Sequence, residues 1–177
     1  MMQVSKLLLT LKLIVKEIIA SAKSGTIRKS NCIATGKQLY HEWQISVHLK
    51  FEQNTNNGYA NVFKLIGKPQ SGSPNRLPGA FLRPRQNKLM IQLSGTSSWI
   101  SRDLGTDWFN LKILHRQRNG NSEFEIKIND DLMITKTEKT DSQMWKNVAV
   151  YFARSQPAKG RYQNFKLQTI ADNCEST

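Results

Sequence analysis

The sequence predicts an all-β fold: a jelly-roll β-sandwich of two antiparallel sheets, preceded by a short N-terminal helix. Two observations lead to this prediction. Beyond residue 31, apolar and polar residues alternate with period two in one stretch after another, as in strands with one buried face. Runs of Asn, Gly, Ser and Pro separate these stretches without an intervening helical period, which favours a sandwich or barrel. The 177 residues suffice for one domain with its own core.

The N-terminal segment has a different period. Its apolar residues recur at spacings of three and four, which is typical of an amphipathic helix: Leu8, Leu11, Ile14, Val15, Ile18 and Ile19. We therefore expect a helix over residues 3–22 and a boundary near residue 30, which separates residues 1–30 from a sandwich domain at 31–172. Three interpretations of the helix stay open: a secretory signal cleaved at Ala20-Ser21-Ala22, a part of a longer chain, or a basic interfacial helix. A membrane-spanning helix is not expected, because no run of about 18 apolar residues occurs.

The first strands are predicted between residues 31 and 67. Ile33 to Thr35 open the series, and the apolar residues from Trp43 to Phe51 alternate with Gln44, Ser46, His48 and Lys50. Gln53–Gly58 is a run of turn formers, and Tyr59–Gly67 is apolar on both faces, as a central strand would be. Lys68–Pro78, rich in Ser, Gly and Pro, is expected to be the longest loop and to lie at one end of the sandwich.

The later strands follow the same rule. Alternation predicts strands within 80–83, 89–93, 109–113, 124–128, 132–137, 148–152 and 165–169. Asn119-Gly120 is a strong hairpin signal, and Asn129-Asp130-Asp131 is a second tight turn. The inward positions predict one shared core that contains Trp43, Ile45, Val47, Leu49, Phe51, Ile91, Ile113, Ile126, Val148, Val150, Phe152 and Phe165.

Several of these strands resemble a known family. Glu42–Phe51, Trp108–Ile113, Phe124–Leu132, Trp145–Tyr151 and Phe165–Leu167 are similar in pattern and spacing to strands of laminin-G-like and pentraxin-like jelly rolls, over roughly residues 38–168. These jelly rolls belong to the concanavalin A-like lectin and glucanase superfamily. The resemblance implies a lectin-type sandwich whose relatives mostly bind glycans or proteins outside cells. The galactose-binding motif of galectins is absent, so their specificity is not implied.

Catalysis is not expected. The glucanases of the superfamily carry an E-x-D-x-E strand, but the nearest sequence here, Glu123-Phe-Glu125-Ile-Lys127, ends in lysine and lacks the second catalytic carboxylate. A Gly-x-Ser-x-Gly elbow is also missing. No cofactor is predicted. Calcium stays open as a ligand of Asp103 with Asp107 or of the Asp130-Asp131 turn, although neither shows the spacing of a known calcium loop.

The net charge of +13 favours anionic partners. Arginine forks suit sulfates and carboxylates, and aromatic rings suit sugar faces, so we predict ligand binding by Arg76, Phe81, Arg83, Arg85, Lys88, Trp99, Arg116, Arg118 and Arg161. An ordinary solvated basic surface is the competing interpretation. The functional hypothesis is therefore non-catalytic recognition of a glycan or protein. Electrostatic binding of polyanions such as sulfated glycans, or a structural and adhesive role in a larger protein, are the alternatives. Nucleic acid is not expected, because no base-reading module is present.

The resemblance also implies a disulfide. In such jelly rolls the first and last strands commonly pair, and this pairing would bring Cys32 and Cys174 together. The competing interpretation is two unrelated free thiols. A bond between them would indicate an oxidising compartment and hence a secreted, extracellular protein.

Overall fold

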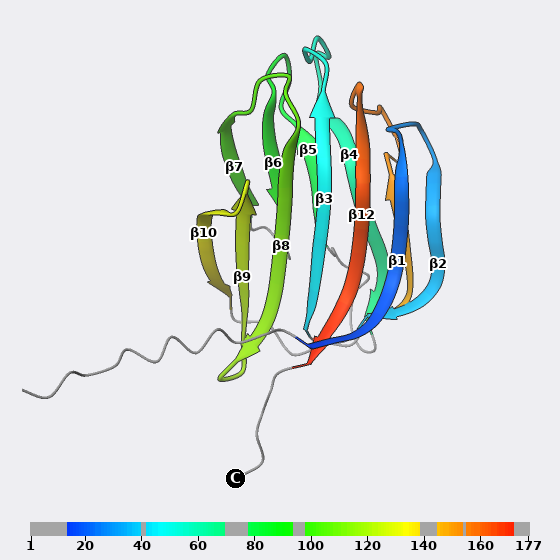
Figure 1. The fold of residues 1–177 in the computed structure, drawn as a ribbon, viewed down its shortest axis with the longest axis vertical. Coiled ribbons are helices and arrows are strands. Elements are labelled where there is room, and N and C mark those ends of the chain that lie inside the picture. Colours follow the sequence, from blue (N-terminus) through cyan, green and yellow to red (C-terminus); the bar gives the residue numbers. More distant parts are fainter. Residues whose placement is uncertain are drawn as a thin grey trace, which may run out of the picture.

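The protein folds into two antiparallel β-sheets packed face to face (Figure 1). The computed structural model describes residues 14–39, 42–69, 78–93, 98–138, 145–153 and 155–171. We call the sheet nearer the viewer in Figure 1 the front sheet and the other one the back sheet. The front sheet has the order β1-β12-β3-β8-β9-β10, with bounds Ile14–Thr26, Gly160–Ala171, Trp43–Phe51, Phe109–Arg118, Asn121–Ile128 and Asp131–Glu138. The back sheet has the order β2-β11-β4-β5-β6-β7, with bounds Asn31–Leu39, Trp145–Phe152, Ala60–Pro69, Gly79–Leu82, Lys88–Gln92 and Ser98–Asp103.

Two tight hairpins in the front sheet confirm the predicted turns. Asn119 and Gly120 both have positive φ, at 50° and 76°, between β8 and β9. Asn129 and Asp130 likewise have φ of 52° and 67° between β9 and β10. Two successive residues with positive φ give the type I′ geometry, whose twist matches that of the flanking strands, and Asn, Asp and Gly tolerate it best.

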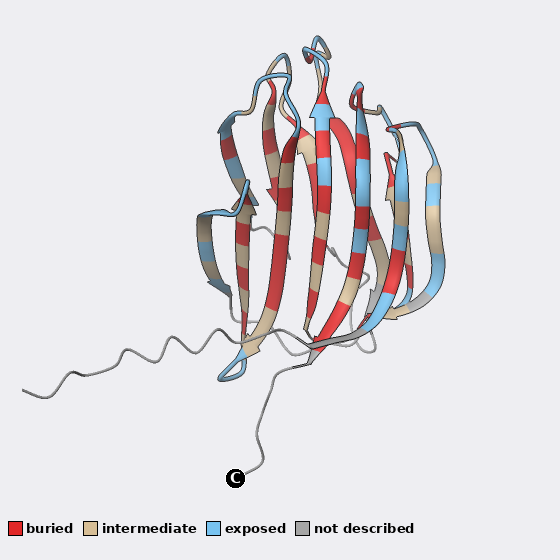
Figure 2. Cartoon of the chain, in the orientation of Figure 1, coloured by how far each residue is buried: buried red, intermediate tan, exposed pale blue. Residues whose placement is uncertain are grey.

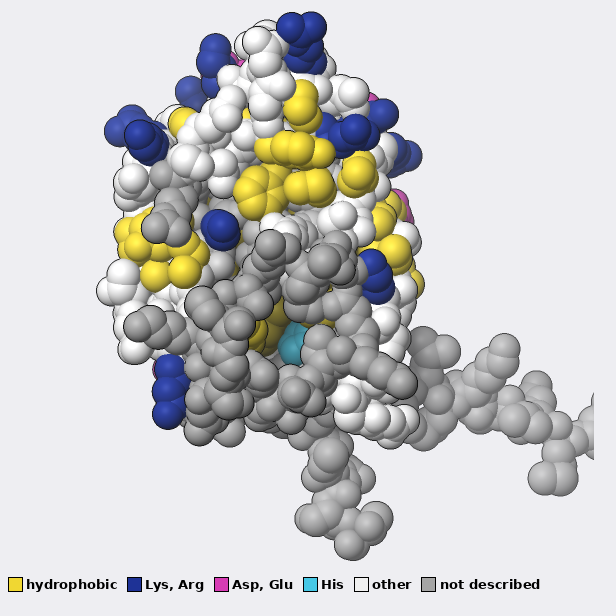
Figure 3. Space-filling model, turned by 180° about the vertical axis from the view of Figure 1, so that it is seen from behind, with side chains coloured by type: hydrophobic (Ala, Val, Ile, Leu, Met, Phe, Trp, Pro, Cys, Tyr) yellow, Lys and Arg dark blue, Asp and Glu magenta, His cyan; other side chains and the backbone are white. Residues whose placement is uncertain are grey.

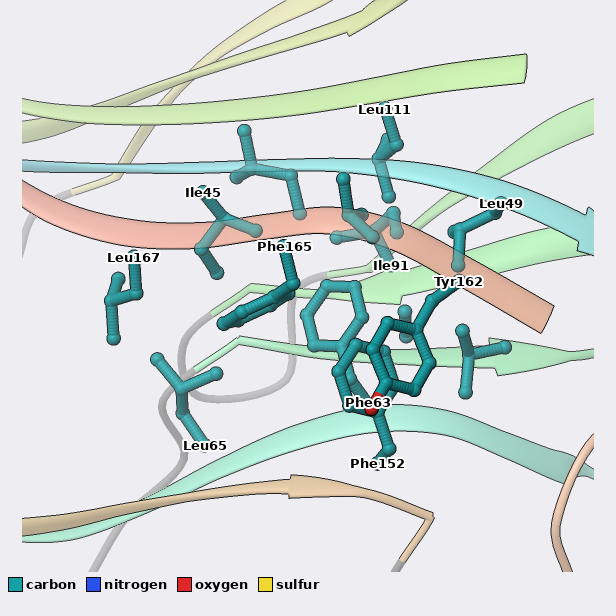
Figure 4. Packing of buried hydrophobic residues seen from close by; sticks show 14 of the residues in the cluster. Ile45, Leu49, Phe63, Leu65, Ile91, Leu111, Phe152, Tyr162, Phe165 and Leu167 are labelled. Atoms are coloured by element: carbon teal, nitrogen blue, oxygen red, sulfur yellow. The ribbon is translucent and has the colours of Figure 1, made fainter. Parts of the chain in front are cut away.

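The core between the sheets contains every residue that the alternation assigned to it. All twelve predicted core side chains, from Trp43 to Phe165, are buried in one cluster, and Figure 2 shows the buried and exposed positions alternating along the strands. Aromatic rings join the two sheets: Phe152 of β11 stacks on Tyr162 of β12 with ring centroids 3.7 Å apart, and Phe165 meets Phe63 edge-on at 6.1 Å (Figure 4). The predicted sandwich and its period are therefore confirmed.

The expected N-terminal helix is wrong where the structure describes it. Ile14–Thr26 form the strand β1, which pairs with β12 from Ile14 opposite Ala171 to Thr26 opposite Arg161. The spacing of three and four does not mark one buried face, because Ile19 and Ala20 are buried while Ile18 is 54% exposed, and β1 has two register shifts against β12. Pairing with a neighbouring strand overrides a weak local helical preference. Residues 1–13 lie outside the described part.

This strand also changes the expected domain boundary. Because β1 is an edge strand of the front sheet, the described part of residues 1–30 is integral to the sandwich rather than a separate segment. The cleavage site expected at Ala20-Ser21-Ala22 lies within β1. In the described residues, no helix is long and apolar enough to cross a membrane.

The topology contradicts the pairing on which the disulfide prediction rested. The last strand does pair with the first, β1, but Cys32 lies on β2 in the other sheet, opposite Tyr151 of β11, and is an exposed free thiol. The backbone amide of Ile27 donates a hydrogen bond to the carbonyl of Gly160, the first residue of β12. Cys32 follows Ile27 by five residues and therefore lies near the start of β12. The 12 residues of β12 extend roughly 35–40 Å to Ala171. Cys32 therefore lies far from the described end of β12. Cys174 itself lies outside the described residues, so the bond stays untested.

Candidate functional site

The outer face of the front sheet carries a polar depression at its centre. Period two turns Ile45, Val47 and Leu49 into the core and leaves Ser46 and His48 on the outer face of β3. Strand pairing then sets Ser46 between Lys166 of β12 and Lys112 of β8, and His48 between Gln163 and Asn110. The result is a shallow hollow of about 270 Å³, which we call the front-face depression. Its lining residues are Ser46, Val47, His48, Asn110, Lys112, Asn164 and Lys166.

A β-bulge shapes one wall of this depression. The register of β12 against β3 shifts between Gln163 and Lys166, and Asn164 within the shift has a φ of 51°. Asparagine tolerates the left-handed region better than most residues. A bulge redirects side chains at a local irregularity, and here it adds the Asn164 amide to the groups around the hollow.

The two lysines of the depression differ in their electrostatic environment. Lys112 forms an ion pair with Asp130 in the β9–β10 turn. The hydrogen bond from Lys112 and its charge, with a smaller contribution from Lys127, lower the pKa of Asp130 below its usual 3.8. Lys166 is exposed, and the described residues contain no ion pair that involves it. Of the two lysines that line the depression, Lys166 is therefore the one better able to bind an anionic ligand.

Glu125, a carboxylate of β9 in the same sheet, is already paired with two cations. Arg116 Nη1 lies 3.3 Å from Glu125 Oε1, and Lys127 Nζ lies 3.8 Å from Glu125 Oε2. Phe124, Ile126 and Ile128 are buried, so Glu123 and Glu125 lie on the outer face as the alternation predicts. None of the residues that line the depression is acidic. The described residues also contain no group of three or more His, Cys, Asp or Glu that could hold a metal ion.

Part of the predicted basic and aromatic cluster gathers on the back sheet. Phe81 of β5 and Lys88 of β6 point to its outer face, since Ala80, Leu82 and Leu89 are the buried neighbours. Arg83 and Arg85 lie in the turn between β5 and β6. Arg85 has a φ of 55° and donates from Nε to Asn57 Oδ1 at 2.9 Å. Arg76 lies outside the described residues, as does most of the Lys68–Pro78 loop, and Lys68 and Pro69 already belong to β4.

The other predicted binding residues are scattered. Trp99 of β7 packs against the core, which leaves it only partly exposed. Trp108, just before β8, is 39% exposed. Arg116 is paired with Glu125 on the front sheet, Arg118 is exposed at the β8–β9 hairpin, and Arg161 is exposed at the start of β12, opposite Lys50. These side chains therefore do not form one site.

The front-face depression was not predicted from the sequence. Alternation identifies Ser46, His48, Asn110 and Lys112 as outward residues, which is the only signal available. That β3 lies between β8 and β12 depends on pairing between strands far apart in the chain. The bulge that adds Asn164 shows in the sequence only as a spacing of three between the buried residues Tyr162 and Phe165.

Comparison with known proteins places the fold but not the ligand. No protein-family model matches the chain, and no curated protein matches it. Among solved structures, the CBM40 module of the Ruminococcus gnavus IT-sialidase, bound to α2,3-sialyllactose, is similar with a TM-score of 0.52 at 11% identity, covering 85% of this chain and 96% of that one. The fold is that of the concanavalin A-like and pentraxin-like sandwiches.

Two further structures agree with this fold. Domain 4 of AbnA, an extracellular arabinanase of Geobacillus stearothermophilus in complex with arabinotriose, matches with a TM-score of 0.56 at 14% identity, over 90% of this chain and 96% of that one. The pentraxin of Limulus polyphemus matches with a TM-score of 0.53 at 9% identity, over 83% and 74%. At such identities the likeness concerns the fold alone, and it confirms the family resemblance at that level.

Proposed function

We propose that this chain is a non-catalytic module that binds a glycan with an anionic group in the front-face depression. The observation that carries the proposal is the composition of the lining. One hydroxyl, one imidazole, two amides and two ammonium groups surround the same hollow. Hydroxyl, imidazole and amide groups donate and accept hydrogen bonds, as sugar hydroxyls require, and an ammonium group favours a carboxylate or sulfate.

The charge of the molecule supports an anionic ligand over a neutral one. The net charge is +13, and Lys166 has no competing carboxylate among the described residues. A similar module holds sialyllactose, whose sialic acid carries a carboxylate. A cationic face of this kind attracts anionic ligands at a distance and holds them through charge-assisted hydrogen bonds.

The same lining argues for binding without hydrolysis. Glycosidases generally place two carboxylic groups on either side of the scissile bond. The residues that line the depression include no acid, and the nearby Glu125 is held between Arg116 and Lys127. We also propose that the module acts outside the cell, a location supported by the likeness to a domain of an extracellular arabinanase.

Calorimetric titration with α2,3-sialyllactose and with lactose, its neutral counterpart, tests the proposal. The sialylated sugar should bind more tightly, and its advantage should shrink as the salt concentration rises, because salt screens exposed charges. Lys166→Gln should weaken sialyllactose binding about tenfold, since a hydrogen bond to a charged group contributes about 1.5 kcal/mol or more.

Lys29→Gln provides the matched control, because Lys29 is an exposed lysine between β1 and β2, outside the depression. This variant should bind like the unmodified protein. Equal affinity for the two sugars, or an unchanged affinity in Lys166→Gln, would contradict the proposal.

A further inference from the structure

The outer face of the back sheet carries an apolar row that the front-face depression does not involve. Strand pairing sets Phe81 of β5 opposite Met90 of β6, and Met90 opposite Ile100 of β7. Ile100 is 42% exposed, and Phe81 and Met90 are partly exposed. Figure 3, which views the molecule from behind, shows hydrophobic side chains gathered on this face with Lys and Arg around them. We call Phe81, Met90 and Ile100 the back-face strip.

The Phe81 ring leans along its own strand. A Cβ atom added at Gly79 would come within 3.0 Å of Phe81 Cε2 and 3.2 Å of Cζ, so the ring occupies the space above this glycine. Residues two apart on a strand share one face, and only glycine leaves room for the ring to lie there. The ring therefore covers the sheet as part of a flat apolar surface.

Polar and cationic groups border the strip on both sides. On one side, strand pairing places Lys64 of β4 opposite Gly79 of β5. Gly79 in turn lies opposite Gln92 of β6, and Gln92 lies opposite Ser98 of β7. On the other side lies Lys88, opposite Asp103 and beside Arg83, whose backbone amide donates to the Lys88 carbonyl at 3.0 Å. Because successive outward positions along a strand are about 6.6 Å apart, these cations lie within reach of any ligand seated on the strip.

We propose that the back-face strip is a second binding site, for a sugar chain that carries sulfate or carboxylate groups. Such a chain combines apolar ring faces with repeated negative charges, which matches an apolar row flanked by lysines. Phe81 supplies the stacking surface, Lys64 and Lys88 hold the anionic groups, and Gln92 and Ser98 bond hydroxyls. A second copy of this chain fits less well, because its own lysines would face those of the first. The site is independent of the front-face depression, which lies on the other sheet.

Titration with a short heparin oligosaccharide tests the proposal, because this probe is sulfated along its length. Phe81→Ala should weaken binding about fivefold to tenfold, in the range of one aromatic contact, and Phe81→Tyr should retain it. The double variant Lys64→Gln/Lys88→Gln should weaken binding further and flatten its salt dependence. Gly79→Ala should also weaken binding, because the new Cβ displaces the ring.

The front-face variant Lys166→Gln separates the two sites. It should leave the amide NMR shifts that heparin induces at residues 79–92 unchanged, whatever its effect on sialyllactose. Three results would overturn the proposal: heparin shifts absent from residues 79–92, equal binding by Phe81→Ala and the unmodified protein, or sedimentation showing that Phe81→Ala dissociates a dimer. A thermal melt of each variant establishes that the sandwich is intact.

Discussion

The ammonium group of Lys112 on β8 contacts the carboxylate of Asp130 in the turn between β9 and β10. This contact lies at the edge of the front-face depression, which Lys112 helps to line. Asp130 therefore competes with an anionic sugar for the ammonium group of Lys112. The ion pair is exposed on the surface, so it is easily exchanged for another anionic partner.

Asp130→Asn should consequently strengthen binding of an anionic sugar. The substitution removes the competing charge, and asparagine accepts the positive φ of 67° that the turn requires. We expect a gain in affinity for sialyllactose of about twofold to fivefold, the size of a surface charge interaction, and no change for lactose. Calorimetry measures both. Weaker binding of sialyllactose would show that Asp130 positions Lys112 for the ligand rather than competing with it.

The same pair predicts how Asp130 titrates. Its pKa is lowered by the hydrogen bond and charge of Lys112, so the carboxylate stays ionised to a lower pH in the folded protein than in the unfolded chain. The stabilisation from this pair is present above the ordinary pKa of 3.8 and is lost as the pH falls through the lowered value. Carboxyl NMR titration should place the midpoint below 3.8. Lys112→Gln should raise that midpoint, whereas the control variant Lys29→Gln should not.

The comparison of sequence with structure shows which features are local. Trp43 to Phe51 alternate strictly, and their burial follows the same alternation, because one face of β3 covers the core over its whole length. The Asn119-Gly120 turn is also local, since its geometry depends on those two residues. The front-face depression is not local: Ser46 and Lys166 become neighbours only through the pairing of β3 with β12.

The error at the N-terminus has a related cause. Ile18 and Ile19 fit an amphipathic helix by spacing alone, but pairing with β12, through two register shifts, forms a strand in which Ile19 is buried and Ile18 is exposed. The shifts depend on the contact with β12, which no window of the sequence contains. The strand pairing assumed for the disulfide was wrong for the same reason, because it needed Cys32 to lie on a strand next to β12, and Cys32 lies on β2 in the other sheet.

Gly25→Ala tests whether β1 is packed as an integral strand. A Cβ atom at Gly25 would lie 2.5 Å from Tyr162 Oη. The Tyr162 ring cannot move aside freely, because it stacks on buried Phe152 with an interplanar angle of 6°. Overpacking of this kind destabilises by about 1–3 kcal/mol. Urea unfolding should show that loss for Gly25→Ala and almost none for Ser24→Ala, an exposed neighbour in the same strand. Equal stability of the two variants would mean that β1 is not held against Tyr162.

A buried asparagine joins three loops at the end of the sandwich near Arg83. Asn87 Oδ1 accepts a hydrogen bond from the backbone amide of Asn54 at 2.9 Å, and Asn87 Nδ2 donates to the Gly105 carbonyl at 2.6 Å. Asn54 in turn donates from Nδ2 to the Arg83 carbonyl at 2.6 Å. Asn87 is only 1% exposed, so water cannot readily replace these bonds.

Asn87→Ala should therefore destabilise the protein without disturbing the front-face depression. It leaves the buried backbone amide of Asn54 without its partner, which costs about 1–3 kcal/mol, and it removes the bond to the exposed Gly105. At about 2–4 °C per kcal/mol for a chain of this size, the melting temperature should fall by roughly 2–12 °C. Asn87→Asp keeps the acceptor for Asn54 but places a buried carboxylate oxygen against the Gly105 carbonyl, so it should also melt below the unmodified protein. Gln53→Ala, at an exposed position in the same loop as Asn54, should melt like the unmodified protein. Sialyllactose binding below the melting range should stay unchanged in all three variants. A melting temperature of Asn87→Ala within about 1 °C of the control, which is the scatter of surface substitutions, would show that these loops do not depend on the asparagine.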